Sequence, residues 1–334
     1  MINEGILNAI GNTPLVPLTN LFEGARFSVF AKIESLNPGG SIKDRAALSM
    51  LRHGIATGAI DEDTVIIESS SGNMGIGLAQ ICASLGLRFI CVVDKKTTAQ
   101  NIRILRAYGA ETEMVDQPDE GGEFLGPRLN RVKSLLRLVP NSFWPNQYAN
   151  LHNPLAHRQT MREIVEALHG RVDYLFCAVS TCGTLRGCAE YACDNGLQTT
   201  VVAVDAVGSI IFGGEKSKRL IPGHGASVRP ALFKPGLVRD CIRVCDIDCV
   251  VGCRRLVRSE GILAGGSSGA VVMALEQCRD SIPAGRNCVV ILPDRGERYL
   301  DTIYSDEWVS THFGNVFELW EGRPKAQQLC AATA

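Results

Sequence analysis

The sequence predicts an α/β fold of two domains, each built on a largely parallel sheet that helices cover. Three observations lead to this prediction. Apolar runs of strand length alternate with amphipathic segments of helix length. The alternation breaks near residues 140–150 and then resumes, and a length of 334 residues suits two small domains or one large one. Strict alternation favours parallel sheets, because a helix is the usual crossover between parallel strands.

The first block of elements runs from about residue 64 to residue 115. Its expected strands are short and rich in Val, Ile and Phe, and its expected helices repeat apolar residues every three or four positions. We expect strands at 64–68, 88–93 and 111–115, and helices at 74–85 and 97–108.

The second block shows the same alternation and ends near residue 292. We expect helices at 154–168, 185–194 and 267–278, and strands at 173–179, 200–204 and 287–292. Pro and Gly cluster between Gly208 and Pro235, which indicates a long irregular segment. Periodicity is lost after about Trp320, so a frayed tail is expected there.

Composition excludes several classes of protein. With 34 Lys and Arg against 35 Asp and Glu, the formal net charge is -1, so no global field favours nucleic acid or an anionic membrane. The start of the chain lacks the pattern of a secretory signal. Its longest apolar runs are of strand length, so no membrane span is expected.

Thirteen scattered cysteines indicate a reducing cytoplasm rather than a disulfide framework. Cys241, Cys245, Cys249 and Cys253 recur every four residues, as the ligands of a metal might. However, 241–245 resembles a strand and a helix is expected from about Asp246 or Asp248. Four thiols on two elements do not suit one metal, so we expect buried thiols and no metal site.

The first chemical motif is the segment 37–45, Asn-Pro-Gly-Gly-Ser-Ile-Lys-Asp-Arg. A Gly-Gly turn that leads into a helix places Lys43 in the first turn, with Ser41 as a possible N-cap. The positive end of a helix favours the unprotonated amine, which Schiff-base chemistry with an aldehyde cofactor requires. The alternative is a solvated lysine balanced by Asp44.

Three further loops are rich in Ser, Thr and Gly, and each lies between a strand and a helix. They are 68–77, Ser180–Thr184 and Gly265–Ala270. Backbone N–H groups and hydroxyls at a helix N-terminus suit an anion such as a carboxylate or a phosphate ester. The glycine spacing is not that of a dinucleotide site. Each loop alone could be a capped turn; their combination with Lys43 is the specific signal.

These motifs, with the opening Ile-Gly-Asn-Thr-Pro-Leu at 10–15, resemble the fold-type II pyridoxal-phosphate family, the β-family of cysteine synthases and cystathionine β-synthases. The resemblance runs from about Ile10 to about Asp301. It implies a fold like that of the tryptophan synthase β-chain, with two open twisted α/β domains and pyridoxal 5'-phosphate in the cleft between them. It also implies a homodimer.

The resemblance implies a role for each motif. Lys43 is the catalytic residue and forms the Schiff base with the cofactor, and Asn73 hydrogen-bonds the cofactor's ring hydroxyl. The cofactor phosphate is held by Ser180, Thr181, Cys182, Gly183 and Thr184. The substrate carboxylate is bound by Ser70, Ser71, Gly72 and Asn73.

The family also implies domain boundaries. Residues 39–148 would form a smaller domain that closes on the substrate, and 1–38 with 149–320 a larger domain that binds the cofactor. Residues 321–334 would be a disordered tail.

Some residues depart from the cysteine synthase pattern. Met74 occupies the place of a threonine that contacts substrate, and Arg295 that of a serine expected to face the pyridine nitrogen. A guanidinium cannot accept a proton. Ser267 is therefore the first candidate for that contact, and Asp294 the second.

One branch of the family is a closer match, on the segments 146–150, 204–213 and 299–308. It comprises the N-(2-amino-2-carboxyethyl)-L-glutamate synthases of 2,3-diaminopropionate and siderophore biosynthesis. The resemblance implies that O-phospho-L-serine loses phosphate to leave an α-aminoacrylate, which L-glutamate then attacks. The alternatives are a cysteine synthase that uses sulfide and a catalytically silent relative that acts as a binding protein.

The remaining candidates concern the acidic substrates. Arg128 could bind phosphate or carboxylate in a bidentate manner, and Arg131, one turn on, could do so instead. Gln147, Tyr148 and Ser180 complete the expected substrate site. Arg128 and Tyr148 each have an ordinary structural alternative, a solvated helix charge for Arg128 and an aromatic side chain at the edge of the core for Tyr148. His224, in the irregular segment, is expected to be structural or to gate a loop.

Overall fold

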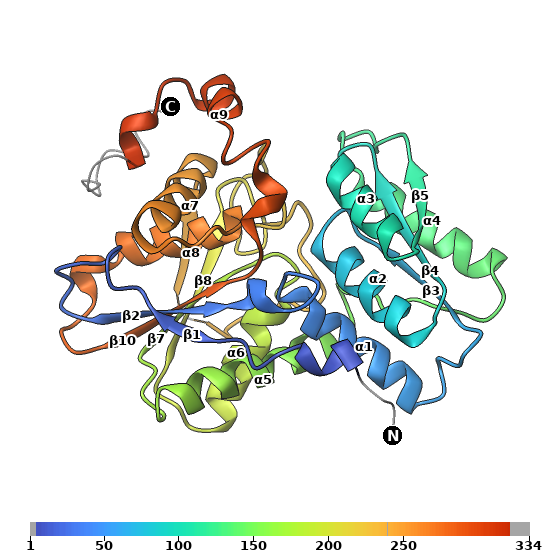
Figure 1. Cartoon of the computed structure of the whole chain (residues 1–334), viewed down its shortest axis with the longest axis horizontal. Helices are drawn as coiled ribbons and strands as arrows, with labels where there is room; N and C mark the ends of the chain where they lie inside the picture. The colour runs from blue at the N-terminus through green and yellow to red at the C-terminus, as the bar shows by residue number, and fades with distance from the viewer. Residues whose placement is uncertain (1–4, 239, 321–334) are drawn as a thin grey trace. The chain divides into compact units, whose positions relative to one another are not determined.

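The computed structural model describes residues 5–238 and 240–320 (Figure 1). The expected tail at 321–334 lies outside these residues. The chain divides into two compact units: 5–11 with Leu36–Ala156, and Asn12–Ser35 with the residues from 157 onwards. Relative to the boundaries expected above, the first unit also contains 5–11, and its second boundary falls inside helix α5 (His152–Ala167).

The first unit has a four-stranded parallel sheet in the order β5-β4-β3-β6. Its strands are β3 (Val65–Ser69), β4 (Phe89–Asp94), β5 (Glu111–Val115) and β6 (Ser142–Phe143). Its helices are α1 (Lys43–Ala56), α2 (Asn73–Leu85), α3 (Ala99–Ala107) and α4 (Leu125–Leu138), and a 3-10 helix η1 (Gly5–Ala9) precedes them.

Helices cover both faces of this sheet. Ile66 of β3 belongs to a cluster with α1 and α2, whereas its neighbours Val65 and Ile67 pack with Val132 and Leu135 of α4. Successive strand residues point to opposite faces, so a strand buried on both faces is apolar throughout. Two polar residues end this strand, and they lie at the carboxyl edge where the candidate site is built.

The second unit has a six-stranded sheet in the order β1-β2-β10-β7-β8-β9, in which only β1 is antiparallel to its neighbour. Its strands are β1 (Leu15–Pro17), β2 (Ser28–Ile33), β7 (Tyr174–Ala178), β8 (Thr200–Ala206), β9 (Asp240–Val244) and β10 (Asn287–Leu292). In Figure 1, α5 and α6 (Gly183–Asp194) lie on one side of these strands, and α7 (Asp246–Glu260) and α8 (Gly266–Gln277) on the other. After β10 the chain adds η4 (Gly296–Tyr299), α9 (Asp306–Phe313) and η5 (Phe317–Trp320).

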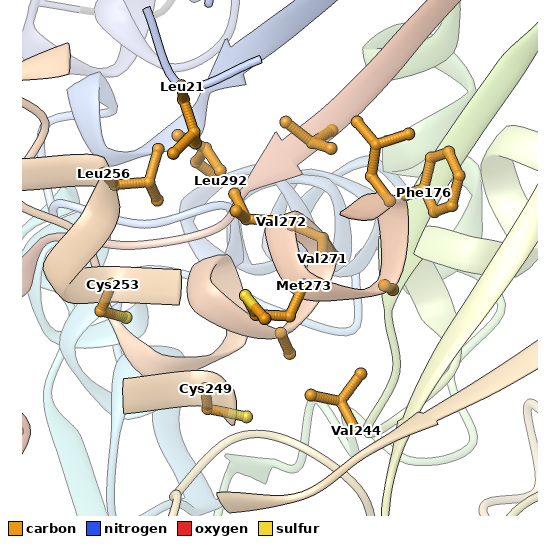
Figure 2. Close-up of a cluster of buried hydrophobic side chains, with 14 of the residues drawn as sticks. Leu21, Phe176, Val244, Cys249, Cys253, Leu256, Val271, Val272, Met273 and Leu292 are labelled. Carbon is orange, nitrogen blue, oxygen red and sulfur yellow. The ribbon is translucent and has the colours of Figure 1, made fainter. Parts of the chain in front are cut away.

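Helix α8 forms the centre of this unit, and all of its residues up to Glu276 are buried. It packs closely on α7, because a side chain at Gly269 would lie 1.9 Å from the Cys249 carbonyl oxygen. Figure 2 shows Cys249 and Cys253 of α7 in the same apolar cluster as Val271 and Met273 of α8. Burial raises the pKa of the Cys253 thiol to about 12, so these thiols act as small apolar side chains.

The four regularly spaced cysteines do not line one helix. Cys241 is on β9, Cys245 is the N-cap of α7, and Cys249 and Cys253 are on α7, which begins at Asp246 as expected. Within 5–238 and 240–320, no group of three or more His, Cys, Asp or Glu side chains could hold a metal ion. No helix in those ranges is both long enough and apolar enough to cross a membrane.

Strand β2 was not expected from the sequence. Lys32 interrupts its apolar run, yet this side chain is buried, with its Nζ atom 2.6 Å from the Glu163 Oε2 atom of α5. The partner lies 131 positions away, so the local pattern could not show that the charge would be neutralised. Helix α4 was also absent from the expected elements.

Candidate active site

Lys43 is the first residue of α1 and is half-buried. A turn places it there, because the Gly40 N–H donates to the Asn37 carbonyl (2.8 Å) and Gly40 has a φ of +83°. Ile42 is the N-cap, so the expected cap at Ser41 is one residue early, although the Ser41 hydroxyl accepts the Lys43 N–H at 3.2 Å. The lysine thus stands at the positive end of a 14-residue helix.

Asp44 fixes the turn that precedes the lysine. Its fully buried carboxylate accepts the Gly39 N–H at 2.6 Å. A Cβ atom on Gly39 would lie only 2.6 Å from the Asp44 Oδ1 atom, so glycine is required at this place. Asp44 therefore orders the backbone that leads to Lys43.

The second motif forms the turn between β3 and α2. Ser70 is buried, and its Oγ atom accepts the N–H groups of Gly72 (3.2 Å) and Gly75 (2.9 Å). Ser71, Gly72 and Asn73 are half-buried at the start of α2, where the first N–H groups of a helix point outward. This turn suits a carboxylate bound through backbone N–H groups, with the Ser70 hydroxyl occupied in shaping it.

Arg128 is only 8% exposed on α4. Its Nε atom lies 3.2 Å from the Asp94 Oδ2 atom at the end of β4. Its Nη1 atom is buried and has no hydrogen-bond partner among the described residues. Arg131 differs: it is more exposed and its Nη2 atom lies 2.7 Å from the Glu113 Oε1 atom. Of the two arginines, Arg128 therefore retains donors for an anion.

Tyr148 and Gln147 lie in the loop between β6 and α5. Gln147 is buried, and its Nε2 atom donates to the Ser69 carbonyl at 3.1 Å, which joins this loop to β3. Tyr148 is half-buried. Burial raises the pKa of the Tyr148 hydroxyl, and the positive charge of Arg128 opposes this shift, so the two side chains share one electrostatic environment.

Ser180–Thr184 form the turn between β7 and α6. Thr181 and Cys182 are buried, and Ser180 and Thr184 are half-buried. Cys182 is the N-cap of α6 and has a φ of +67°, in the left-handed region that usually favours glycine. The turn ends at a helix N-terminus, which suits the phosphate of an ester.

Sequence reasoning missed His157 as a contact of this turn. His157 is completely buried on α5, and its Nε2 atom lies 3.3 Å from the Thr184 Oγ1 atom. Its Nδ1 atom lies 3.4 Å from Thr160 Oγ1. The histidine thereby orients one hydroxyl of the turn before α6. A buried histidine on an amphipathic helix gives no local sign of such a partner.

The three candidates for the pyridine nitrogen are differently engaged. Ser267 is in the first turn of α8 and is 9% exposed. The Asp294 Oδ2 atom accepts the Tyr299 hydroxyl at 2.5 Å, and the Arg295 Nε atom donates to the Ser35 carbonyl at 2.9 Å. The hydroxyl of Ser268 is buried without a hydrogen-bond partner among the described residues. The start of α8 thus offers hydroxyls, whereas the two charged candidates are tied to other groups.

His224 lies in the irregular segment and is linked to the turn before α6 through the residue that follows it. It is fully buried, with its Nε2 atom 3.2 Å from the Val204 carbonyl at the end of β8. The next residue, Gly225, donates its N–H to the Val179 carbonyl at 2.7 Å, one residue before Ser180. Burial lowers the pKa of His224 to about 4, so the ring is neutral and structural near neutral pH.

The residues present fit pyridoxal phosphate. In the first unit, a lysine at a helix start could bind the aldehyde, and Asn73 at the next helix start could reach a ring hydroxyl. In the second unit, the turn before α6 could hold the phosphate. The Ser268 hydroxyl, which has no partner within 5–238 and 240–320, provides a polar group at the start of α8.

Comparisons with known proteins agree with this fit. The sequence model of the pyridoxal-phosphate dependent enzyme family matches residues 6–294. A curated N-(2-amino-2-carboxyethyl)-L-glutamate synthase of Ralstonia nicotianae is 47% identical over 311 residues, which are 93% of this chain and 92% of that protein.

Solved structures show the same fold. A cysteine synthase from Entamoeba histolytica is 30% identical, with a TM-score of 0.85 and 97% of each chain covered. An O-acetylserine dependent cystathionine β-synthase from Helicobacter pylori is 32% identical, with a TM-score of 0.84 over 91% of this chain and 100% of that chain. A hydrogen sulfide-producing enzyme from Fusobacterium nucleatum is 34% identical, with a TM-score of 0.83 over 90% and 100%.

Proposed function

Since this chain belongs to the family of pyridoxal-phosphate dependent enzymes, we propose that it joins the amine of L-glutamate to the β-carbon of O-phospho-L-serine. The products are N-(2-amino-2-carboxyethyl)-L-glutamate and phosphate. The Ralstonia nicotianae relative is named for this product. The structural observation that carries the proposal is the buried Arg128 guanidinium. Its Nη1 atom has no hydrogen-bond partner in the described part of the chain, which suits a substrate with an anionic leaving group.

Lys43 is the base in this proposal. When bound, pyridoxal phosphate supplies an electron sink for negative charge at the substrate α-carbon. The Lys43 amine removes the α-proton, and the bond from the β-carbon to the phosphate oxygen breaks with its electron pair on the phosphate. The glutamate nitrogen then bonds to the β-carbon and loses a proton, and Lys43 returns a proton to the α-carbon.

The loops position the reactants. Ser70, Ser71, Gly72 and Asn73 orient the substrate carboxylate, and Arg128 with Tyr148 binds the leaving phosphate or a carboxylate of glutamate. Ser180, Thr181, Cys182, Gly183 and Thr184 hold the cofactor phosphate, with Ser180 also near substrate. Ser267 in the first turn of α8 would hydrogen-bond the pyridine nitrogen of the bound cofactor. The buried Gln147 acts through Ser69, whose carbonyl accepts its amide.

The proposal extends to biological context. We place the product in 2,3-diaminopropionate and siderophore biosynthesis, and the enzyme in the cytoplasm as a homodimer. All cysteines in the described ranges are free thiols, which suits a reducing compartment.

Product analysis by mass spectrometry tests the reaction. The purified holoenzyme is incubated with O-phospho-L-serine and either L-glutamate or sulfide. A glutamate adduct bearing the aminocarboxyethyl group supports the proposal. Cysteine from sulfide without a glutamate adduct would reassign the chain to the cysteine synthases, and a purified protein that takes up no cofactor would favour a binding role.

A further inference from the structure

Glu68 is a buried carboxylate near the end of β3, in the first unit. Its side chain is completely buried in a strand that is otherwise Val65, Ile66, Ile67 and Ser69. A carboxylate taken out of water destabilises the fold unless several hydrogen bonds replace its hydration. The partners of Glu68 therefore show why this site has an acid rather than another apolar residue.

All the groups that bind the Glu68 carboxylate are N–H donors. Its Oε1 atom accepts the backbone N–H of Ser69 (2.8 Å) and the indole Nε1–H of Trp144 (3.0 Å). Its Oε2 atom accepts the backbone N–H of Gln147 (3.1 Å), and the backbone N–H of Asn146 also hydrogen-bonds the carboxylate. Three of the four donors come from one turn, 144–147.

The backbone of that turn is shaped for an anion. Asn146 has a φ of +53°, in the left-handed region that asparagine tolerates better than most residues. A left-handed residue points consecutive N–H groups to the same side, which creates a concave anion site. Here the anion is the side chain of Glu68, supplied from the strand.

A second bond runs in the same direction, from Gln147 to the end of β3. The Gln147 Nε2 atom donates to the Ser69 carbonyl at 3.1 Å, while the Gln147 N–H donates to Glu68. Behind the turn, the Asn153 Nδ2 atom donates to the Gln147 carbonyl at 2.8 Å. The turn is thus bound to the end of β3 by both its backbone and its side chain.

Both bound segments carry proposed substrate residues. Ser69 leads directly into Ser70–Asn73, and Gln147 is followed by Tyr148. We propose that Glu68 is a positioning residue, whose carboxylate holds Tyr148 in register with Ser70–Asn73 so that the amino-acid substrate binds tightly. This inference deepens the proposed function and rests on it, because it takes both segments to be the substrate site.

The two acceptor oxygens of the carboxylate matter to this role. Since each partner is an N–H donor, a neutral amide at position 68 would bring its own N–H₂ among them and lose an acceptor. The charge of Glu68 also acts on the Cys91 thiol from β4 and on the Tyr148 hydroxyl, and the Arg128 guanidinium from α4 acts on the same two groups with the opposite sign. Burial raises the pKa of Glu68 to about 7, and the four N–H donors oppose the shift.

Glu68→Gln and Glu68→Ala test the proposal against a matched control, Asp61→Asn. Asp61 joins the same two chain segments at their other end, because its Oδ1 atom accepts from Thr64 Oγ1 (2.7 Å) and Asn141 Nδ2 (2.8 Å). Three quantities are measured on each holoenzyme: KM and kcat for O-phospho-L-serine, the bound cofactor from its visible absorbance, and hydrogen exchange of the peptide 144–150.

In Glu68→Gln, we expect KM to rise about tenfold or more, with kcat changed less than about twofold and cofactor content unchanged. The amides of 144–150 should exchange roughly tenfold faster. Asp61→Asn should leave KM and exchange at 144–150 as in the parent. If Glu68→Ala does not fold, Glu68→Gln and the milder Trp144→Phe, which removes one donor, still decide the matter.

Unchanged KM and unchanged exchange in Glu68→Gln would overturn the proposal. The proposal would also be overturned if kcat fell in Glu68→Gln while KM changed as much as it does in Asp61→Asn. A general loss of stability would then explain the behaviour of both variants. Failure of the proposed function gives a different result, because the parent enzyme would then form no glutamate adduct. Hydrogen exchange of the peptide 144–150, and KM for the β-substituted serine that the enzyme does use, would still test the role of Glu68.

Discussion

Arg128 approaches Asp94 with its Nε atom 3.2 Å from the Asp94 Oδ2 atom, yet its Nη1 atom remains buried without a hydrogen-bond partner among the described residues. The carboxylate orients the guanidinium and leaves donors over. A buried donor without a partner is unfavourable by about 1–3 kcal/mol. A bound anion would remove that cost, so this side chain is arranged to bind an anionic ligand reversibly.

Arg128→Lys should therefore raise KM for O-phospho-L-serine by roughly ten- to a hundredfold, because lysine cannot offer the same fork of donors. Cofactor content should not change. Arg131→Ala is the control, since Arg131 pairs with Glu113 near the surface. Steady-state kinetics on both variants check this, and an effect at Arg131 without one at Arg128 would reverse the assignment.

Lys43→Ala should abolish turnover and the visible absorbance of the enzyme–cofactor complex, because no other amine in our assignment bonds to the aldehyde. The turn before α6, which we propose holds the cofactor phosphate, is not altered in this variant, so the cofactor should still bind when its concentration is raised. Absorbance and equilibrium dialysis separate these outcomes. A Lys43→Ala enzyme with parental activity would exclude this lysine as the base.

The main elements near the site follow from local patterns. Four turns near the site each precede a helix: the Gly39-Gly40 turn before Lys43 and the hydroxyl-rich turns before α2, α6 and α8. The glycines and hydroxyl residues of such a turn, and the start of the helix after it, can be recognised within about ten residues of sequence. The Val-rich β8 was expected from its short apolar run, and α7 begins at Asp246 as expected.

The contacts that support those turns could not be predicted. Glu68 meets Trp144 across 76 positions, and Thr184 meets His157 across 27. Neither partner has a sequence signal of its own, because the pairing arises only when separate strands and helices come together. Strand β2 was missed for a similar reason, since the charge of Lys32 is neutralised by Glu163, far along the chain.

Cys182→Gly and Cys182→Ala should differ in stability. Both remove the thiol, but only glycine relieves the left-handed φ of +67° at this N-cap. We expect Cys182→Gly to be more stable than Cys182→Ala by about 1 kcal/mol in urea unfolding. An alanine variant as stable as the glycine variant would show that the backbone here carries no such strain.

Glu68 should make stability depend on pH in an unusual direction. Its pKa in the folded protein is about 7, above the ordinary value of 4.5. The folded state thus binds more protons than the unfolded state between these values, and its free energy of unfolding falls as pH rises through this window. The rise in pKa from 4.5 to about 7 corresponds to at most about 3 kcal/mol. Urea unfolding of the parent and of Glu68→Gln at about pH 5 and about pH 8 measures this effect. The free energy of unfolding should fall less in the variant than in the parent between these pH values, and equal falls would contradict the raised pKa of Glu68.

His224 should act in the opposite direction. Burial lowers its pKa in the folded protein to about 4, below the ordinary 6.5, although its bond to the Val204 carbonyl opposes this. The folded state then binds fewer protons between these values. The contribution of His224 is therefore complete above about pH 6.5 and is lost as pH falls towards about 4, with a limit of about 3 kcal/mol.

His224→Gln isolates this contribution, because its amide can still donate to the Val204 carbonyl but does not titrate. Its unfolding free energy should fall less than that of the parent between about pH 6.5 and about pH 4.5. His312→Gln is the control in the same unit, since His312 is exposed on α9.

Cofactor affinity should depend on pH in the same way. Because Gly225, next to His224, is bonded to the residue before Ser180, the parent should also lose cofactor affinity in this acid range and His224→Gln should lose less. Equal acid sensitivity of the two proteins would mean that the segment around His224 does not support the phosphate-binding turn.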